Sequence, residues 1–85
     1  MSERYNGWAN WATWNVSLWL NNDEAYYRLA RDAARPYANG GMNASDAEQI
    51  VRDILPDGTP DFDGPGDYDE VDWTEIANNL AEMVS

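Results

Sequence analysis

The sequence predicts an all-α protein, a compact bundle of about four short helices with a long acidic loop before the last helix. Three observations predict this fold class. Apolar residues recur at helical spacing in four segments, each segment opens near a helix-capping side chain, and no segment shows the alternation typical of a strand. The chain has 85 residues, which is short for even one ordinary domain, so we expect a single domain over residues 1–85.

The first two helices are expected before Pro36. The first covers residues 11–21, with Asn10 or Thr13 as its cap. Its apolar residues near helical spacing are Trp11, Trp14, Leu18 and Trp19. The second begins in residues 22–24, where a capping side chain precedes acids that favour the positive end of a helix, and Pro36 ends it. Its apolar face consists of Tyr26, Leu29, Ala30, Ala33 and Ala34.

The third and fourth helices are each predicted by a capping box. Ser45 and Glu48 form the first box, which opens a helix that ends before Pro56. Asp72 and Glu75 form the second. The stripe of the closing helix is Trp73, Ile76, Ala77, Leu80 and Val84. We expect the first and last helices to pack together through Trp14, Trp19, Trp73 and Leu80. Between the two boxes, the Pro- and Gly-rich residues 57–70 predict a loop.

Tryptophans are unusually frequent near the start of the chain. Trp8, Trp11 and Trp14 follow at three-residue intervals, with Trp19 beyond them. Such an array could stack bases or sugars. Three-residue steps spread the rings over a broad helical face, which favours the alternative that they form the core.

The composition excludes several kinds of chemistry. The chain has five Arg but no Lys, His or Cys, which excludes an ordinary zinc site, a Ser-His or Cys-His pair and a P-loop lysine. Acid-base catalysis needs a desolvated pocket, for which a Pro- and Gly-rich loop gives no sign. We therefore expect a non-enzymatic protein without a cofactor.

Charge is distributed unevenly along the chain. The formal net charge is −11, and residues 45–85 hold twelve acids against only Arg52. Such a charge opposes direct binding to nucleic acid or to an anionic membrane and favours a basic protein as partner. The residues expected to bind that partner are Asp53, Asp57, Asp61, Asp63, Asp67, Asp69, Glu70, Asp72 and Glu75. The alternative is that these acids only solvate the surface.

A calcium site is a second alternative for the loop. Five of its acids fall at ligand positions of an EF-hand-like frame, namely Asp61, Asp63, Asp67, Asp69 and Asp72. Pro65 occupies position 5 and offers no side-chain oxygen, and Asp72 at position 12 is shorter than the usual Glu. We therefore predict no metal site as the first interpretation.

Residues 5–19 read Tyr-Asn-Gly-Trp-Ala-Asn-Trp-Ala-Thr-Trp-Asn-Val-Ser-Leu-Trp. This opening resembles a family of small, uncharacterised proteins of phages and plasmids, and residues 71–77 resemble the family's closing segment. The resemblance implies a mobile-element setting and no particular activity. Residues 57–70 depart from the family's pattern, so the resemblance implies no role for them.

Small acidic proteins of phages include anti-CRISPR and antirestriction inhibitors, several of which mimic DNA, and this analogy of class guides the functional expectation. We expect a phage protein that binds and inhibits a basic, nucleic-acid-binding defence protein of the host, a CRISPR effector or a restriction component. No apolar run is long enough to cross a membrane. We therefore expect a soluble protein in the host cytoplasm; the sequence does not indicate its oligomeric state.

Overall fold

The computed structural model describes residues 5–38 and 41–84, and helices make up most of both ranges. The elements are α1 (Trp11–Asn22), α2 (Glu24–Ala34), the 3₁₀ helix η1 (Arg35–Tyr37), α3 (Ala44–Ile54), the 3₁₀ helix η2 (Pro65–Glu70) and α4 (Trp73–Met83). Extended backbone pairs only in an isolated bridge between Tyr5 and Trp8, as far as the described ranges extend. The prediction of an all-α fold is confirmed.

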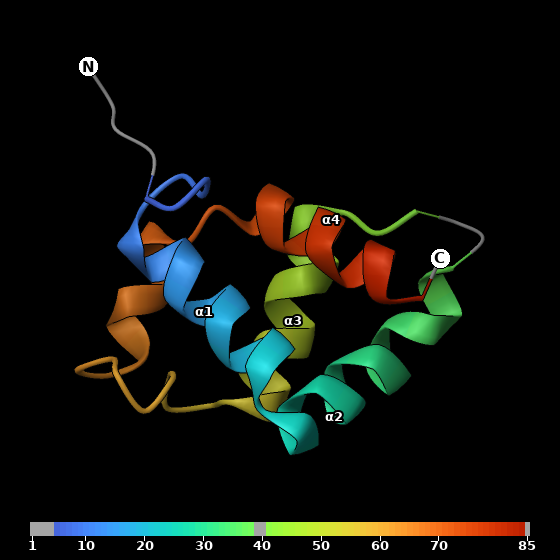
Figure 1. Ribbon diagram of the computed structural model, residues 1–85, viewed down its shortest axis with the longest axis horizontal. Coiled ribbons are helices and arrows are strands. Elements are labelled where there is room, and N and C mark those ends of the chain that lie inside the picture. The colour runs from blue at the N-terminus through green and yellow to red at the C-terminus, as the bar shows by residue number, and fades with distance from the viewer. Residues whose placement is uncertain (1–4, 39–40, 85) are drawn as a thin grey trace.

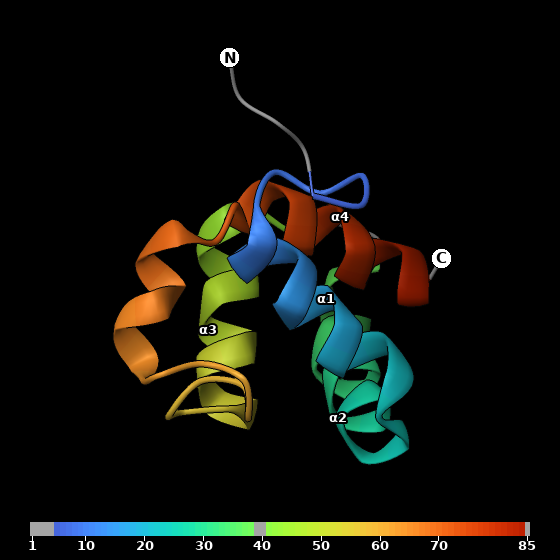
Figure 2. The same cartoon turned by 60° about the vertical axis from the view of Figure 1, so that its left-hand side comes forward.

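The four α-helices form a closed arrangement in which α1 and α3 each contact both α2 and α4 (Figure 1). Helices α2 and α4 also contact each other across it. The segment between α3 and α4, including η2, lies along one side of the molecule, and α2 lies on the other side (Figure 2). Within the described ranges, no helix is both long and apolar enough to cross a membrane.

Side chains at the helix starts explain where the helices begin. Asn10, one of the two predicted candidates, caps α1, and Asp72 caps α4 as predicted, although Glu75 accepts from the Ala9 amide. Helix α2 is capped by Asp23, the middle residue of the predicted start, whereas the pattern of a cap followed by acids pointed to Asn22. The predicted capping box at Ser45 is wrong. Asn43 caps α3 instead, because its Oδ1 accepts from the Asp46 amide at 2.8 Å while Asp46 Oδ2 accepts from the Asn43 amide at 3.2 Å.

The core is mainly aliphatic, with two buried aromatic rings, those of Phe62 and Tyr68. Its other larger members are Val16, Leu20, Ile50, Val51, Ile76 and Leu80. Helix α1 turns Ala12, Val16 and Leu20 inward at four-residue intervals, which leaves its tryptophans on other faces.

The tryptophans are not buried members of the core, contrary to the expectation, although Trp8 and Trp73 pack against it. Each of the five is partly accessible, and Trp11 is 38% exposed. Their rings pack mainly against other aromatic rings: Trp14 lies 5.0 Å from Tyr5, Trp19 lies 6.4 Å from Tyr26 and Trp73 lies 5.5 Å from Tyr68, between centroids. Helices α1 and α4 do contact each other, as predicted; Leu80 is buried in the core and Trp73 packs against it, whereas Trp14 and Trp19 belong neither to the core nor to the side chains packed on it.

Residues 57–70 are not all loop, contrary to the prediction, because η2 occupies residues 65–70. Pro65 at the first position of η2 has a fixed φ that suits a helix start. Asp67 N donates to Gly64 O at 3.2 Å and Val71 N donates to Tyr68 O at 3.1 Å, as i+3 to i bonds of a 3₁₀ helix do.

Candidate functional site

Residues 55–72 connect α3 to α4, and we call them the acidic segment. A buried side-chain amide on α1 holds this segment against the helix. Asn15, on α1, is 1% exposed. Its Nδ2 donates to Asp61 Oδ2 at 2.8 Å, and its Oδ1 accepts from the hydroxyl of the buried Thr59. Trp19 Nε1 donates to the same Asp61 oxygen at 2.9 Å. These bonds fix the first part of the segment along one helix.

The second part of the segment is fixed by the N-terminal end of α1. Asn10 Nδ2 donates to Glu70 O at 2.6 Å. The buried Thr13 hydroxyl accepts from the Asp72 amide at 2.8 Å and donates to Asn10 Oδ1 at 2.7 Å. Residues from one turn of α1 thus determine where η2 ends and α4 begins.

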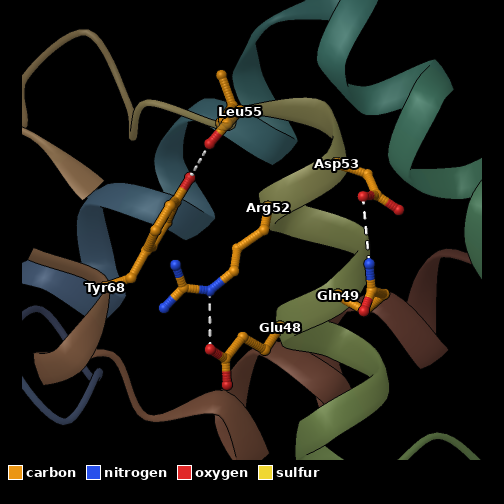
Figure 3. Close-up of polar contacts among 6 residues, drawn as sticks. All are labelled: Glu48, Gln49, Arg52, Asp53, Leu55 and Tyr68. Atoms are coloured by element: carbon orange, nitrogen blue, oxygen red, sulfur yellow. Dashed lines mark hydrogen bonds and ion pairs between the residues drawn. The ribbon is translucent and has the colours of Figure 1, made fainter. Parts of the chain in front are cut away.

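Tyr68 fixes the middle of the segment from inside. Its side chain is fully buried and its hydroxyl donates to Leu55 O at 2.6 Å, at the end of α3 (Figure 3). Its ring meets the ring of Phe62 edge-on, with centroids 5.3 Å apart. The segment is therefore anchored at its start, middle and end by side-chain hydrogen bonds.

Arg52, the one base in residues 45–85, does not neutralise the acids of the segment. Its Nε lies 2.8 Å from Glu48 Oε2, and its guanidinium lies 5.0 Å from the centroid of the Tyr68 ring. Figure 3 shows Arg52 and Glu48 extending from α3 toward Tyr68. The single positive charge of this half is thus paired within α3.

Six of the predicted partner-binding acids are exposed and form no ion pair with a described residue, and four of these six also accept no side-chain hydrogen bond within the described ranges. We call these four the loop carboxylates: Asp57, Asp63, Asp69 and Glu70. All four lie in the anchored segment on one side of the molecule (Figures 1 and 2). They are the members of the predicted set best placed to meet another protein.

The other predicted acids have contacts within the fold. Asp53 extends to the side of α3 away from Tyr68 and accepts from Gln49 Nε2 at 3.2 Å (Figure 3). Asp67 Oδ2 accepts from the Asp63 amide at 2.9 Å. Asp72 caps α4. Glu75 Oε1 accepts from the Ala9 amide at 2.6 Å.

Asp61 is exposed to solvent, but one of its carboxylate oxygens, Oδ2, accepts two hydrogen bonds from α1. Hydrogen bonds from Asn15 and from Trp19 lower the pKa of Asp61 below its ordinary value of 3.8, since they favour the charged form, and desolvation opposes them. The carboxylate is therefore ionised at neutral pH, with two neutral donors in place of a counter-ion.

The five acids of the calcium alternative do not converge on one point. In residues 5–38 and 41–84, no three acidic side chains lie close enough together to hold a metal ion. Asp61 faces α1 and Asp72 caps α4, so two of the five are used by the helices. This arrangement gives a calcium ion no ready set of ligands.

The residues that hold the segment were not predicted from the sequence: Asn10 beyond its capping role, Thr13, Asn15 and Trp19. The signal was present, because Thr13 and Asn15 are polar residues in a helical segment that is rich in apolar residues. Three of these residues belong to the Asn-x-x-Thr-Trp-Asn part of the opening motif. In the same motif, Asn6 and Gly7 both have positive φ and form the tight turn between Tyr5 and Trp8.

Comparison with known proteins gives a family without an assigned activity. The model of a family of unknown function, DUF7249, matches residues 1–85 and so includes the acidic segment. No curated protein and no solved structure matches the chain.

Proposed function

We propose that this chain, which belongs to the DUF7249 family, is a non-enzymatic module that binds the basic surface of a nucleic-acid-handling protein. The observation that carries the proposal is the set of loop carboxylates, four exposed charges without an ion-pair partner on an anchored backbone. Anchoring matters because a segment that is already ordered loses less conformational entropy when it binds.

The charge of the whole protein supports this proposal. A net charge of −11 on 85 residues attracts a basic surface over a distance and raises the association rate at low salt. Grooves that bind nucleic acid are lined with Arg and Lys, which meet carboxylates as readily as phosphates. We propose a partner of this kind, a CRISPR effector or a restriction component of the host cell.

The finer proposal is that the protein is an inhibitor from a phage or related mobile element, acting as a DNA mimic in the cytoplasm of the host. A DNA mimic blocks the groove that it occupies. Binding of the partner to this protein and to nucleic acid must then be mutually exclusive, which separates mimicry from binding elsewhere on the partner.

A matched pair of variants tests the proposal. Asp63→Asn/Asp69→Asn removes two loop carboxylates, and Glu24→Gln/Asp32→Asn removes two acids from α2, on the other side of the molecule (Figure 2). Glu24 and Asp32 pair with Arg28 and Arg35 at exposed positions, so their loss has little effect on stability. Both variants change the net charge equally.

The tagged protein and both variants are used to capture partners from host lysate at low and high salt, with identification by mass spectrometry. We expect the wild type and the α2 variant to retain a nucleic-acid-binding protein that the loop variant loses and that salt releases. The purified partner should then lose its nucleic acid when the wild type is added, in a mobility-shift assay. Equal retention by the two variants, or an undisturbed nucleic-acid complex, would contradict the proposal.

A further inference from the structure

Helix α1 presents a stripe of three residues to the acidic segment. Trp11, Asn15 and Trp19 follow at four-residue intervals, so they lie on one face of the helix. The ring of Trp11 lies 5.8 Å from the ring of Phe62, between centroids. Trp19 and Asn15 both bind Asp61. The carboxylate of Asp61 therefore lies along a stripe whose two indoles are about 12 Å apart on the helix axis.

The contacts of Asp61 are strong enough to orient it but leave its charge uncompensated. Both of its hydrogen bonds from side chains reach Oδ2, and no basic side chain of the described residues pairs with it. Asp61 is exposed, and Trp11 is 38% exposed. An oriented, ionised carboxylate and an accessible indole thus lie on the same side of α1.

We propose that Asp61 and Trp11 together receive an arginine side chain of the partner, while Trp19 orients the carboxylate through its indole N–H. This inference rests on the proposed function and specifies the chemistry of the partner's contact. The planar guanidinium stacks on an indole face while its N–H groups donate to a carboxylate. A lysine ammonium is a compact and strongly hydrated charge, so it gains less from the indole of Trp11.

The loop carboxylates have a different part in this arrangement. They attract any cationic surface, because they act through charge alone, whereas the Asp61 site distinguishes arginine from lysine. The two contributions therefore separate when two cationic probes of equal charge are compared.

The probes are oligoarginine and oligolysine peptides of equal length, titrated into the full chain by calorimetry at low salt. We expect the wild type to bind oligoarginine about three-fold more tightly than oligolysine, as a partly exposed cation–π contact allows. Trp11→Leu keeps an apolar contact with Phe62 and removes the indole, so it should lose this preference and keep its affinity for oligolysine.

A matched pair of charge variants isolates the carboxylate. Asp61→Asn keeps an oxygen that can accept from Asn15 and Trp19, and Asp63→Asn removes an equal charge two residues away. Asp61→Asn should weaken oligoarginine binding more than Asp63→Asn does. The indole N–H resonance of Trp19 reports on the site in the unmodified protein and should move with oligoarginine more than with oligolysine.

Three outcomes separate the inference from the proposed function. Arginine preference that depends on Trp11 and Asp61 supports both. The arginine site is overturned if the two peptides bind equally, Asp61→Asn and Asp63→Asn have the same effect, and the Trp19 resonance does not depend on the choice of peptide. That result is still compatible with the acidic binding surface of the proposed function. Failure of both peptides to bind overturns both proposals.

Discussion

Replacing Tyr68 with Phe removes one buried hydrogen bond and little else. The hydroxyl donates to Leu55 O at 2.6 Å. The same carbonyl also accepts from the Gly58 amide at 3.1 Å, so it keeps a partner in the variant. The Phe ring preserves the contacts of the Tyr68 ring with its aromatic neighbours. The cost is therefore the net value of one hydrogen bond, about 1 kcal/mol, without the larger penalty for an orphaned acceptor.

Thermal and urea unfolding at neutral pH measure this cost. For a domain of this size, about 1 kcal/mol corresponds to a fall in Tm of about 4–8 °C. Circular dichroism of the folded variant should match that of the wild type, which shows that the fold is retained. A variant as stable as the wild type would show that the Tyr68 hydroxyl contributes nothing to the anchoring of the acidic segment.

The pH dependence of the same variant gives a second, independent check. Burial raises the pKa of Tyr68 from 10.0 to about 12, although the positive charge of Arg52 opposes the shift. Between these two pH values the unfolded chain loses the Tyr68 proton while the folded chain keeps it, so stability is fully present below pH 10 and falls as pH rises toward 12. Tyr68→Phe lacks this contribution. The stability advantage of the wild type should therefore shrink across this interval, and a constant advantage would refute the reasoning.

Three further predictions concern the contacts that hold the segment. Asn15→Ala should lower the free energy of unfolding by about 2 kcal/mol in urea titrations, because the proton of the buried Thr59 hydroxyl loses its acceptor, Asn15 Oδ1; an unchanged midpoint would contradict this. Gly58→Ala should lower the free energy of unfolding by about 1–3 kcal/mol, since φ is +97° and the new Cβ would lie 2.9 Å from a ring carbon of Phe62. As a control, the Cβ of Gly64→Ala meets no atom within 4 Å, so this variant should melt at nearly the same temperature as the wild type. Asp61→Asn should reduce the loss of stability on acidification. The pKa of Asp61 is lowered in the fold, so the ionised carboxylate stabilises the fold above pH 3.8, and this stabilisation is lost as pH falls below that value. Parallel acid-unfolding curves for the variant and the wild type would argue against this.

The helices were predictable where local chemistry decides them. Asp72 caps α4 and the apolar stripe of α4 contains Ile76 and Leu80, and both features depend on near neighbours in the sequence. The start of α3 was predicted wrongly, because Ser45 and Asn43 are both suitable caps within two residues of each other. Sequence alone does not rank two good caps at that separation.

Long-range contacts explain what could not be predicted. Thr13 and Asn15 are buried because partners more than forty residues away accept or donate to them, and no local pattern names those partners. The tryptophans were placed in the core because of their large apolar surface. Yet an indole N–H needs an acceptor, which Trp19 finds in Asp61 at the rim of the fold. The acidity of the segment was predictable, but the contacts that anchor it were not.

The polar contacts of α1 also determine how the chain reaches its native state. The buried groups of Thr13 and Asn15 obtain their partners from residues 59–72, so α1 cannot complete its hydrogen bonds until most of the chain is available. A fragment that stops at Leu55 would bury the Asn15 amide without its partners, or leave α1 undocked. We therefore expect folding to be a single cooperative transition that depends on contacts between residues distant in the sequence, and neither half of the chain to fold without the other.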